Sequence, residues 1–271
     1  MSIPTQVHDR RRRQDRRRSE PHPITEDLAE ALTGDELELL FQPQFSAEDH
    51  AVVGAEALVR WEHPDHGKLA GDALVAIAQS GGIARRLSRH ITRAALIAAS
   101  DWPPEQRLSI NVTAMDLFDR TFAEDLLAML AELDFPPERL TLEITEQALV
   151  ADLDRSAEKL KLLSAHGLRI ALDDFGAGFC NFRYLKVLPL DALKLDRSMI
   201  EGIANDPRDL AVLRGIIAMA RALDLTVIAE GIETDAQRGV AVQEGCAVWQ
   251  GFLGGKPVPA KDFDTKSAFS F

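Results

Sequence analysis

Short apolar runs alternate with longer amphipathic segments along the chain from about residue 25 onward. Runs of this kind, bounded by turn-forming residues, predict buried strands. The predicted strands are Leu37–Phe45, Val52–Trp61, Leu108–Val112, Leu140–Thr145, Leu168–Asp173, Ala192–Leu195, Thr226–Ala229 and Ala247–Leu253.

Helical patterns lie between most of these strands. The predicted helices are Arg85–Ser100, Thr121–Leu133, Asp152–His166, Asn205–Leu223 and Thr234–Gly245. Thr121 and Thr234 each precede a Glu or Gln by three residues, which is the spacing of a capping box. Gly167 and Gly245 stand where glycine commonly ends a helix. Eight strands with helices between them predict an α/β protein with a (β/α)8 barrel.

The composition is that of a globular protein with a full core: 271 residues, 46% hydrophobic and 27% charged. No apolar run approaches the roughly 18 residues that a membrane span needs. The N-terminus also lacks the apolar core of a signal peptide. We therefore expect a cytoplasmic location, in which Cys180 and Cys246 stay reduced.

Charge is unevenly distributed along the chain. The net charge is −12, but residues 1–20 hold seven Arg against three acidic residues and carry +4, which leaves −16 on the rest. An acidic body disfavours general nucleic-acid binding, because phosphate neutralisation needs clustered Lys and Arg. We predict a disordered Arg-rich tail over residues 1–23 and a single domain over residues 24–271. The tail is either a solvated leader or an arm for an acidic partner, nucleic acid or anionic lipid.

Two adjacent carboxylates, Asp173 and Asp174, follow the apolar run that ends at Leu172. Gly176 and Gly178 come next and indicate a sharp turn. A strand that ends in such a turn can aim both carboxylates into one space, where two like charges need a cation or a proton between them. Oxygen ligands suit Mg²⁺, Mn²⁺ or Ca²⁺. For this pair taken alone, the alternative is a solvated Asp-Asp turn.

The other predicted strands also carry polar side chains within or directly after their apolar runs. In a (β/α)8 barrel the active site lies at the carboxyl ends of the strands. The polar residues in question are Glu56, Asn111, Glu143, Asp173, Asp174, Lys194, Glu230, Glu233 and Gln250. Because burying one unpartnered carboxylate is costly, their recurrence on separate strands indicates a shared site. One Lys among several carboxylates fits a hydrolytic metal centre better than a network of ion pairs.

The segment Glu56-Ala57-Leu58, continued by Val59 to Pro64, resembles the signature of the EAL domain, the cyclic di-GMP phosphodiesterase family. The triplet alone is uninformative, but further segments resemble the family in the same order. They are Phe41–Pro43, Ser109–Thr113, Leu142–Glu146, Asp173–Gly178, Leu193–Asp196, Ala229–Thr234, Gln250–Phe252 and Lys256–Pro257. The resemblance covers about residues 36–257. It implies a modified (β/α)8 TIM-like barrel whose first strand runs antiparallel to the others.

The resemblance also implies two ions, Mg²⁺ or Mn²⁺, and a role for each polar residue. One ion would be held by Glu56, Asn111, Glu143 and Asp173, and a second by Asp173, Asp174 and Glu230. Lys194 and Gln250 would hold or polarise the attacking water. Gln42 and Arg60 would contact the substrate, with Arg60 at a phosphate; an ion pair with Glu62 is its structural alternative. Glu146 and Glu233 would support neighbouring loops.

The implied activity is hydrolysis of cyclic di-GMP to linear 5′-pGpG in bacterial second-messenger signalling. Two metals lower the pKa of a bridging water and clamp the phosphodiester. Either Glu230 or Lys194 would then act as the base, and the residues leave that choice open. The resemblance further implies a homodimer.

Some positions depart from the family pattern. Cys180-Asn181 is an unusual end to the loop after Asp174, and Ala70, Ala73 and Gln79 stand where the family usually has Pro, Phe and Glu. These departures bear on rate and regulation. Two alternatives therefore stay open: a catalytically inactive receptor of cyclic di-GMP, and a protein-interaction module that binds a regulatory partner through its Arg-rich tail.

Overall fold

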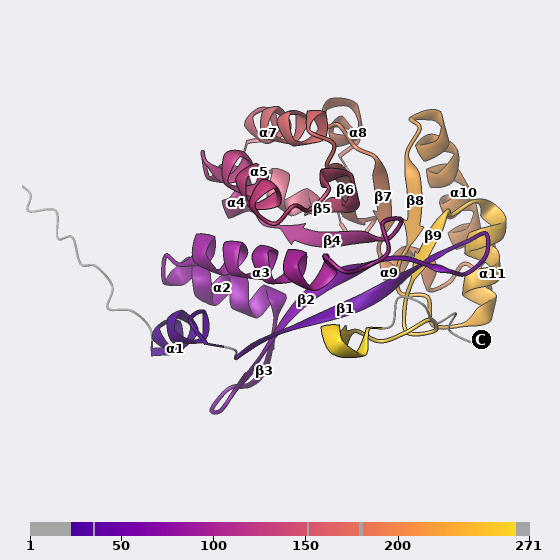
Figure 1. The fold of residues 1–271 in the computed structure, drawn as a ribbon. Coiled ribbons are helices and arrows are strands. Elements are labelled where there is room, and N and C mark those ends of the chain that lie inside the picture. Colours follow the sequence, from indigo (N-terminus) through magenta and orange to yellow (C-terminus); the bar gives the residue numbers. More distant parts are fainter. Residues whose placement is uncertain (1–22, 35, 151, 179–180, 264–271) are drawn as a thin grey trace, which may run out of the picture.

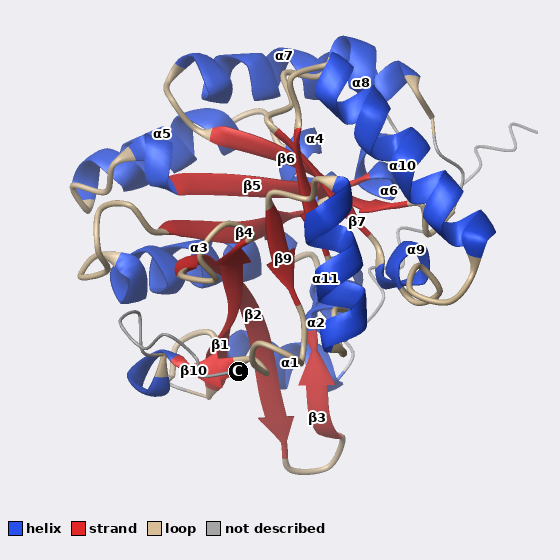
Figure 2. Ribbon diagram, turned by 90° about the vertical axis from the view of Figure 1, so that its right-hand side faces the viewer, coloured by secondary structure: helices blue, strands red, loops and turns tan. Residues whose placement is uncertain are grey.

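Within the described residues, eight strands close into a barrel and helices surround it (Figures 1 and 2). The computed structural model describes residues 23–34, 36–150, 152–178 and 181–263. The barrel strands are β1 (Leu37–Ser46), β2 (Val52–His63), β4 (Arg107–Val112), β5 (Leu140–Thr145), β6 (Arg169–Phe175), β7 (Ala192–Leu195), β8 (Thr226–Ala229) and β9 (Val248–Gln250). Two short strands, β3 (Gly67–Ala70) and β10 (Val258–Pro259), pair with β2 and β1.

Strand β1 runs antiparallel to both of its neighbours in the barrel. It pairs with β2 from Leu37↔Trp61 to Phe45↔Val52, and with β9 from Gln44↔Gln250 to Ser46↔Val248. All other neighbours in the barrel pair in parallel. The reversed first strand that the resemblance implies is therefore confirmed.

Helices occupy the connections between parallel strands, because parallel neighbours cannot be joined by a tight turn. These connections hold α2 (Gly71–Ser80), α3 (Ala84–Ala99), α4 (Ala114–Phe118), α5 (Phe122–Glu132), α6 (Glu146–Leu149), α7 (Leu153–Ala165), α8 (Arg183–Val187), α9 (Arg197–Ile200), α10 (Pro207–Ala222) and α11 (Asp235–Glu244), with the 3₁₀ turn η1 (Pro137–Arg139). Helix α1 (Pro23–Ala31) precedes β1, and a second 3₁₀ turn, η2 (Ala260–Asp262), follows β10. The predicted α/β barrel is confirmed.

Side chains alternate between the two faces of each barrel strand. The main apolar core lies between the strands and the helices and includes Leu142, Leu172 and Leu193. A separate small apolar cluster consists of Ala171, Ala192 and Ile228, with Val248 packed against it. Two positions further along the same strands stand Asp173, Lys194, Glu230 and Gln250. The polar side chains therefore form the next layer on the same face, toward the carboxyl ends of the strands.

All eight predicted strands correspond to barrel strands, but several elements were missed or misplaced. The last strand is shorter than predicted, and β6 continues to Phe175 rather than ending at Asp173. The sequence analysis did not predict β3, β10, the helices α1 and α2 or the short helices α4, α6, α8 and α9. The predicted Arg-rich tail lies outside the described residues, except that Pro23 begins α1.

Helix capping was predicted correctly at Thr234 and wrongly at Thr121. Thr234 forms a capping box with Gln237, and Gly245 ends α11 in the left-handed conformation. Thr121 makes no capping hydrogen bond, because its backbone, with φ of −101° and ψ of 1°, lacks the extended conformation of an N-cap residue. Its hydroxyl lies within hydrogen-bond distance of the carboxylates of Asp119 and Asp125.

No helix among the described residues combines the length and the apolar character needed to cross a membrane.

Candidate active site

Seven polar side chains from seven consecutive barrel strands meet at the carboxyl ends of those strands. They are Glu56 on β2, Asn111 on β4, Glu143 on β5, Asp173 on β6, Lys194 on β7, Glu230 directly after β8 and Gln250 on β9. The strand register explains why they meet. Asn111 pairs with Glu143 across β4 and β5, and residues in register on adjacent strands point to the same face.

Lys194 lies at the centre of the carboxylates. Its Nζ atom is 2.6 Å from Oε2 of Glu143, 2.8 Å from Oε1 of Glu230 and 3.2 Å from Oδ1 of Asp173. Oε2 of Glu56 is 3.7 Å away. The Lys194 side chain is 1% exposed, so these interactions are largely protected from solvent. One ammonium group faces four carboxylates, and the layer therefore retains an excess of negative charge.

Burial and this excess of negative charge together shift the pKa values of the site. Burial alone lowers the pKa of Lys194, but the surrounding carboxylates outweigh it and hold the pKa well above its usual value. Burial raises the pKa of Glu143 well above its usual value and that of Glu230 to about 8, although Lys194 opposes both shifts. Burial also raises the pKa of Glu56, but Lys194 and two amides leave it below its usual value. The site therefore favours taking up a proton or a further cation.

Asp173 and Asp174 come together through a distortion of β6. The register with β7 shifts between Leu172 and Phe175, and Asp174 has φ of +54°. Aspartate tolerates this left-handed conformation better than most residues. The backbone N–H of Asp174 donates to Oδ1 of Asp173 at 2.9 Å. The prediction that the strand ends in a turn at Asp173 is thus wrong. An irregularity within the strand, rather than a turn after it, brings the two carboxylates into one space.

Asp173, Asp174 and Glu230 form a group whose donor atoms suit a divalent ion. Each offers one carboxylate oxygen, and the three oxygens lie within 4.8 Å of one another. An all-oxygen donor set with excess negative charge fits a hard divalent cation. Glu56 and Glu143 lie outside this group and contact Lys194, as Asp173 and Glu230 also do, and Nδ2 of Asn111 donates to Oε1 of Glu56 at 2.8 Å.

Comparison with known proteins identifies the family. The family model described as "EAL domain" matches residues 25–257. The chain belongs to the EAL domain family. The family recognised from the sequence motifs is therefore confirmed.

Curated relatives of this EAL domain include two proteins of Pseudomonas aeruginosa. The bifunctional diguanylate cyclase/cyclic di-GMP phosphodiesterase MucR is 34% identical over 242 residues, which are 88% of this chain and 35% of MucR. The cyclic di-GMP phosphodiesterase NbdA is 36% identical over 240 residues, which are 87% of this chain and 31% of NbdA. The chain spans about a third of the length of these curated relatives.

Solved EAL structures share the fold. A complex of the PaMucR phosphodiesterase with c-di-GMP has a TM-score of 0.81 at 34% identity and covers 88% of this chain and 98% of that one. The EAL enzyme Bd1971, in a form bound to cAMP and cyclic di-GMP, has a TM-score of 0.80 at 28% identity and covers 88% and 66%.

The two residues predicted to contact substrate lie on the same face of the EAL barrel as the acidic site. Gln42 pairs in register with Glu56, and its Oε1 accepts a hydrogen bond from Nε2 of Gln250 at 3.0 Å. Arg60 lies four positions beyond Glu56 on β2, hence on the same face and nearer the rim. Its Nη1 donates to the Val59 carbonyl at 2.8 Å, and within the described residues it forms no ion pair with Glu62.

The two predicted loop-supporting residues both contact neighbouring segments. Oε2 of Glu146 accepts a hydrogen bond from the backbone N–H of Asn181, at the end of the loop that follows Asp174. Oε1 of Glu233 lies 2.9 Å from Nη1 of Arg197, which belongs to α9. Residues 179–180 of the unusual loop, including Cys180, lie outside the described residues.

Gln44 belongs to the site, and the sequence analysis missed it. Its side chain is buried, and Nε2 donates to Oε1 of Gln250 at 3.1 Å and lies 3.5 Å from Oε1 of Glu143. Period-two spacing carried the available signal, because Gln44 follows the recognised Gln42 by two positions on the same strand. Trp249, by contrast, lies on the opposite face and stacks on Phe45 at 4.5 Å in the core.

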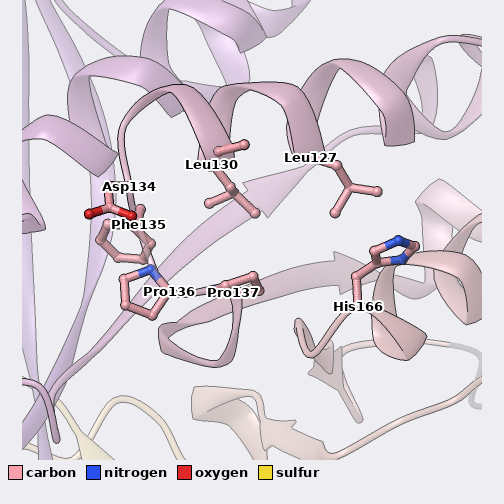
Figure 3. A pocket seen from close by; sticks show the side chains of 8 residues that line it. Leu127, Leu130, Asp134, Phe135, Pro136, Pro137 and His166 are labelled. Carbon is pink, nitrogen blue, oxygen red and sulfur yellow. The ribbon is translucent and has the colours of Figure 1, made fainter.

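A cavity of about 350 Å³ lies at the other end of the barrel (Figure 3). Its lining comes from α5, the segment before β5 and His166 at the end of α7, with Leu127, Leu130 and Phe135 among the apolar contributors. These segments lead into the amino ends of β5 and β6. No residue of the acidic site lines this cavity, so it plays no part in the site.

Proposed function

We propose that this EAL domain is a metal-dependent phosphodiesterase that hydrolyses cyclic di-GMP to linear 5′-pGpG. The observation that carries the proposal is the convergence of four carboxylates on Lys194 at the carboxyl ends of the barrel strands. The names of the relatives MucR and NbdA support it, since both are described as cyclic di-GMP phosphodiesterases. A role in bacterial second-messenger signalling, in the cytoplasm, follows from this substrate.

The proposed cofactor is a pair of Mg²⁺ or Mn²⁺ ions. Asp173, Asp174 and Glu230 would hold one ion, and Glu56, Asn111, Glu143 and Asp173 the other. Such ions, when bound, supply an activated water and stabilise negative charge on the phosphoryl oxygens.

The chain's own residues position the substrate and manage charge. Arg60, near the rim, presents a guanidinium group that suits a phosphate, and Gln42 lies deeper on the neighbouring strand, in register with Glu56. Lys194 places a fixed positive charge where negative charge develops during hydrolysis. Glu230 accepts the proton of the attacking water, because the raised pKa of Lys194 keeps its ammonium group protonated. Nε2 of Gln250 donates a hydrogen bond to Oε2 of Glu56.

A turnover assay tests this function. The purified chain is incubated with cyclic di-GMP and Mn²⁺, and linear product is measured by liquid chromatography. We expect product from the natural chain and at least a hundredfold less from Glu56→Ala, because Glu56 is both a proposed ligand and a partner of Asn111 and Lys194.

The matched control for this assay is Glu158→Ala, which removes an exposed carboxylate on α7 and should leave turnover unchanged. Unaltered turnover in Glu56→Ala would show that the site is assigned wrongly. Binding of cyclic di-GMP without turnover would identify an inactive receptor. Neither binding nor turnover would favour the interaction module with its tail-binding partner.

We also propose a homodimer that pairs through the segment after the Asp173–Asp174 loop. Phe182, directly before α8, supports this assignment because its side chain is 60% exposed although large and apolar. Light scattering after size-exclusion chromatography should give twice the mass of one chain, and Phe182→Glu should return it to one.

A further inference from the structure

Gln44 donates hydrogen bonds but is not itself among the proposed metal ligands. It lies on the reversed strand β1, opposite Gln250 on β9, and is 5% exposed. Its Nε2 donates to Oε1 of Gln250 at 3.1 Å and lies 3.5 Å from Oε1 of Glu143. Nε2 of Gln250 in turn donates to Oε2 of Glu56 at 2.9 Å and to Oε1 of Gln42 at 3.0 Å.

The orientation of the Gln250 amide is determined by its carboxylate neighbour Glu56. An ionised carboxylate only accepts hydrogen bonds, so the amide group that faces it must be the nitrogen. Glu56 therefore fixes the nitrogen of Gln250 toward itself, which leaves the Gln250 oxygen toward Gln44. A buried amide oxygen needs a donor, and Gln44 supplies it.

We propose that Gln44 is a positioning residue that holds the Gln250 amide with its nitrogen toward Glu56. Without the Gln44 donor, the buried oxygen of Gln250 loses its partner, and the amide gains by rotating toward another donor. Such a rotation removes the hydrogen bond that orients the Glu56 carboxylate. Gln44 thus acts on the metal site through Gln250, across the junction where the reversed first strand closes the barrel.

Manganese affinity tests this proposal without relying on turnover. Gln44→Met keeps the side-chain volume but removes the donor, and Mn²⁺ binding is followed by titration calorimetry. We expect the affinity of Gln44→Met to fall about tenfold, as is typical when a residue that orients a metal ligand is lost. The Mn²⁺ affinity of Gln250→Met should fall by a similar factor. Because both residues act through one hydrogen-bond chain, the double variant should be within about twofold of the weaker single variant.

Two independent roles would instead multiply the losses to about a hundredfold in the double variant, and that result would overturn the proposal. A Mn²⁺ affinity of Gln44→Met within twofold of that of the natural chain would also overturn the proposal, because Gln44 would then only fill space in the core. Gln106→Met is the matched control, because Gln106 is also buried but directly precedes β4 and donates to the Val52 carbonyl at the start of β2, away from the acidic site. Its Mn²⁺ affinity should not change.

A catalytic role for Gln44 rests on the proposed phosphodiesterase function, but the Mn²⁺ affinities test the positioning role independently of that function. If the natural chain binds Mn²⁺ but does not hydrolyse cyclic di-GMP, the function fails while the affinity cycle still decides the role of Gln44. Absence of Mn²⁺ binding in the natural chain would overturn both.

A second variant covers the case in which Gln44→Met does not fold. Gln44→Asn retracts the donor by one methylene, and its Mn²⁺ affinity should show the same non-additive loss with Gln250→Met. If turnover is present, Gln44→Met should lower kcat with KM changed less than twofold.

Discussion

At the scale of single residues, the site depends on how Lys194 compensates the negative charge of the buried carboxylates. Lys194 offers one positive charge and three N–H donors to Glu143, Glu230, Asp173 and Glu56. A buried lysine with so many partners is held in place by them, and it also allows them to be buried together. Removing it would leave the carboxylates without compensation until protons or metal ions replace it.

Lys194→Met should therefore destabilise the metal-free protein strongly. Breaking a buried charge network by removing one partner costs about 3–5 kcal/mol. Thermal unfolding in EDTA measures the loss, and Lys161→Met, which removes an exposed lysine of α7, is the control. An unfolding temperature equal to that of the natural chain would contradict the view that Lys194 compensates the buried carboxylates.

Cys246 should be unreactive in the folded protein. Burial raises the pKa of its thiol to about 12, so the reactive thiolate is scarce at pH 8. Peptide mass spectrometry after iodoacetamide treatment should show Cys246 unlabelled in the native protein and labelled in guanidinium chloride. Rapid labelling of Cys246 in the native protein would contradict its placement in the core.

Residue types and strand spacing predicted most residues of the candidate site. The direction of individual side chains and the distortion of the backbone at Asp174 could not be predicted from the sequence. Glu56, Asn111 and Glu143 could be found because each interrupts an apolar run. Gln44 could not be separated from a surface glutamine, because its burial depends on β1 closing against β9, far along the chain. The irregularity at Asp174 depends on a register shift against β7, which no local pattern reveals.

At the scale of elements, the turn after β9 holds Gln250 in the site. Gly251 follows Gln250 directly, and the backbone of Ile232 approaches it closely: a Cβ atom at Gly251 would lie 2.1 Å from the Ile232 carbonyl oxygen. The backbone N–H of Ile232 also donates to the Gln250 carbonyl at 3.1 Å. The segments after β8 and β9 therefore fit together only if residue 251 lacks a side chain.

Gly251→Ala should accordingly displace this turn, destabilise the fold and reduce activity together. Gly239→Ala is the matched control, since Gly239 lies within α11 and an added Cβ would meet nothing within 4 Å. Chemical denaturation should show Gly239→Ala more stable by about 0.5–1 kcal/mol, from helix propensity alone. If Gly251→Ala were as stable as the natural chain, the close approach to Ile232 would be wrong.

Element prediction succeeded for the barrel strands and failed for peripheral elements. Strands buried on both faces read as near-continuous apolar runs, so β6 and β8 could be located from sequence. The helix α1 packs against α2 in a second apolar cluster with Leu28 and Leu74, and Ala70 at the N-cap of α2 makes no capping hydrogen bond. Strand β3 has four residues and forms only as the return of the long β2 hairpin.

At the scale of the whole molecule, barrel closure assembles the chemistry. The order of elements was sufficient to predict a (β/α)8 barrel, but pattern alone gave no direction for β1, and that reversal came from the resemblance. The reversed strand contributes Gln42 and Gln44 to the same layer as Glu56 and Gln250. Closure thus joins residues more than two hundred positions apart, Gln42 and Gln250 among them.

The central claim is that this layer binds divalent ions, and anomalous diffraction tests it most directly. Crystals grown with Mn²⁺ and measured at the manganese absorption edge locate each ion independently of the protein density. We predict a peak about 2.0–2.2 Å from carboxylate oxygens of Asp173, Asp174 and Glu230, with a second peak beside Glu56 and Asn111. A well-ordered crystal with no anomalous peak among these side chains would contradict the account.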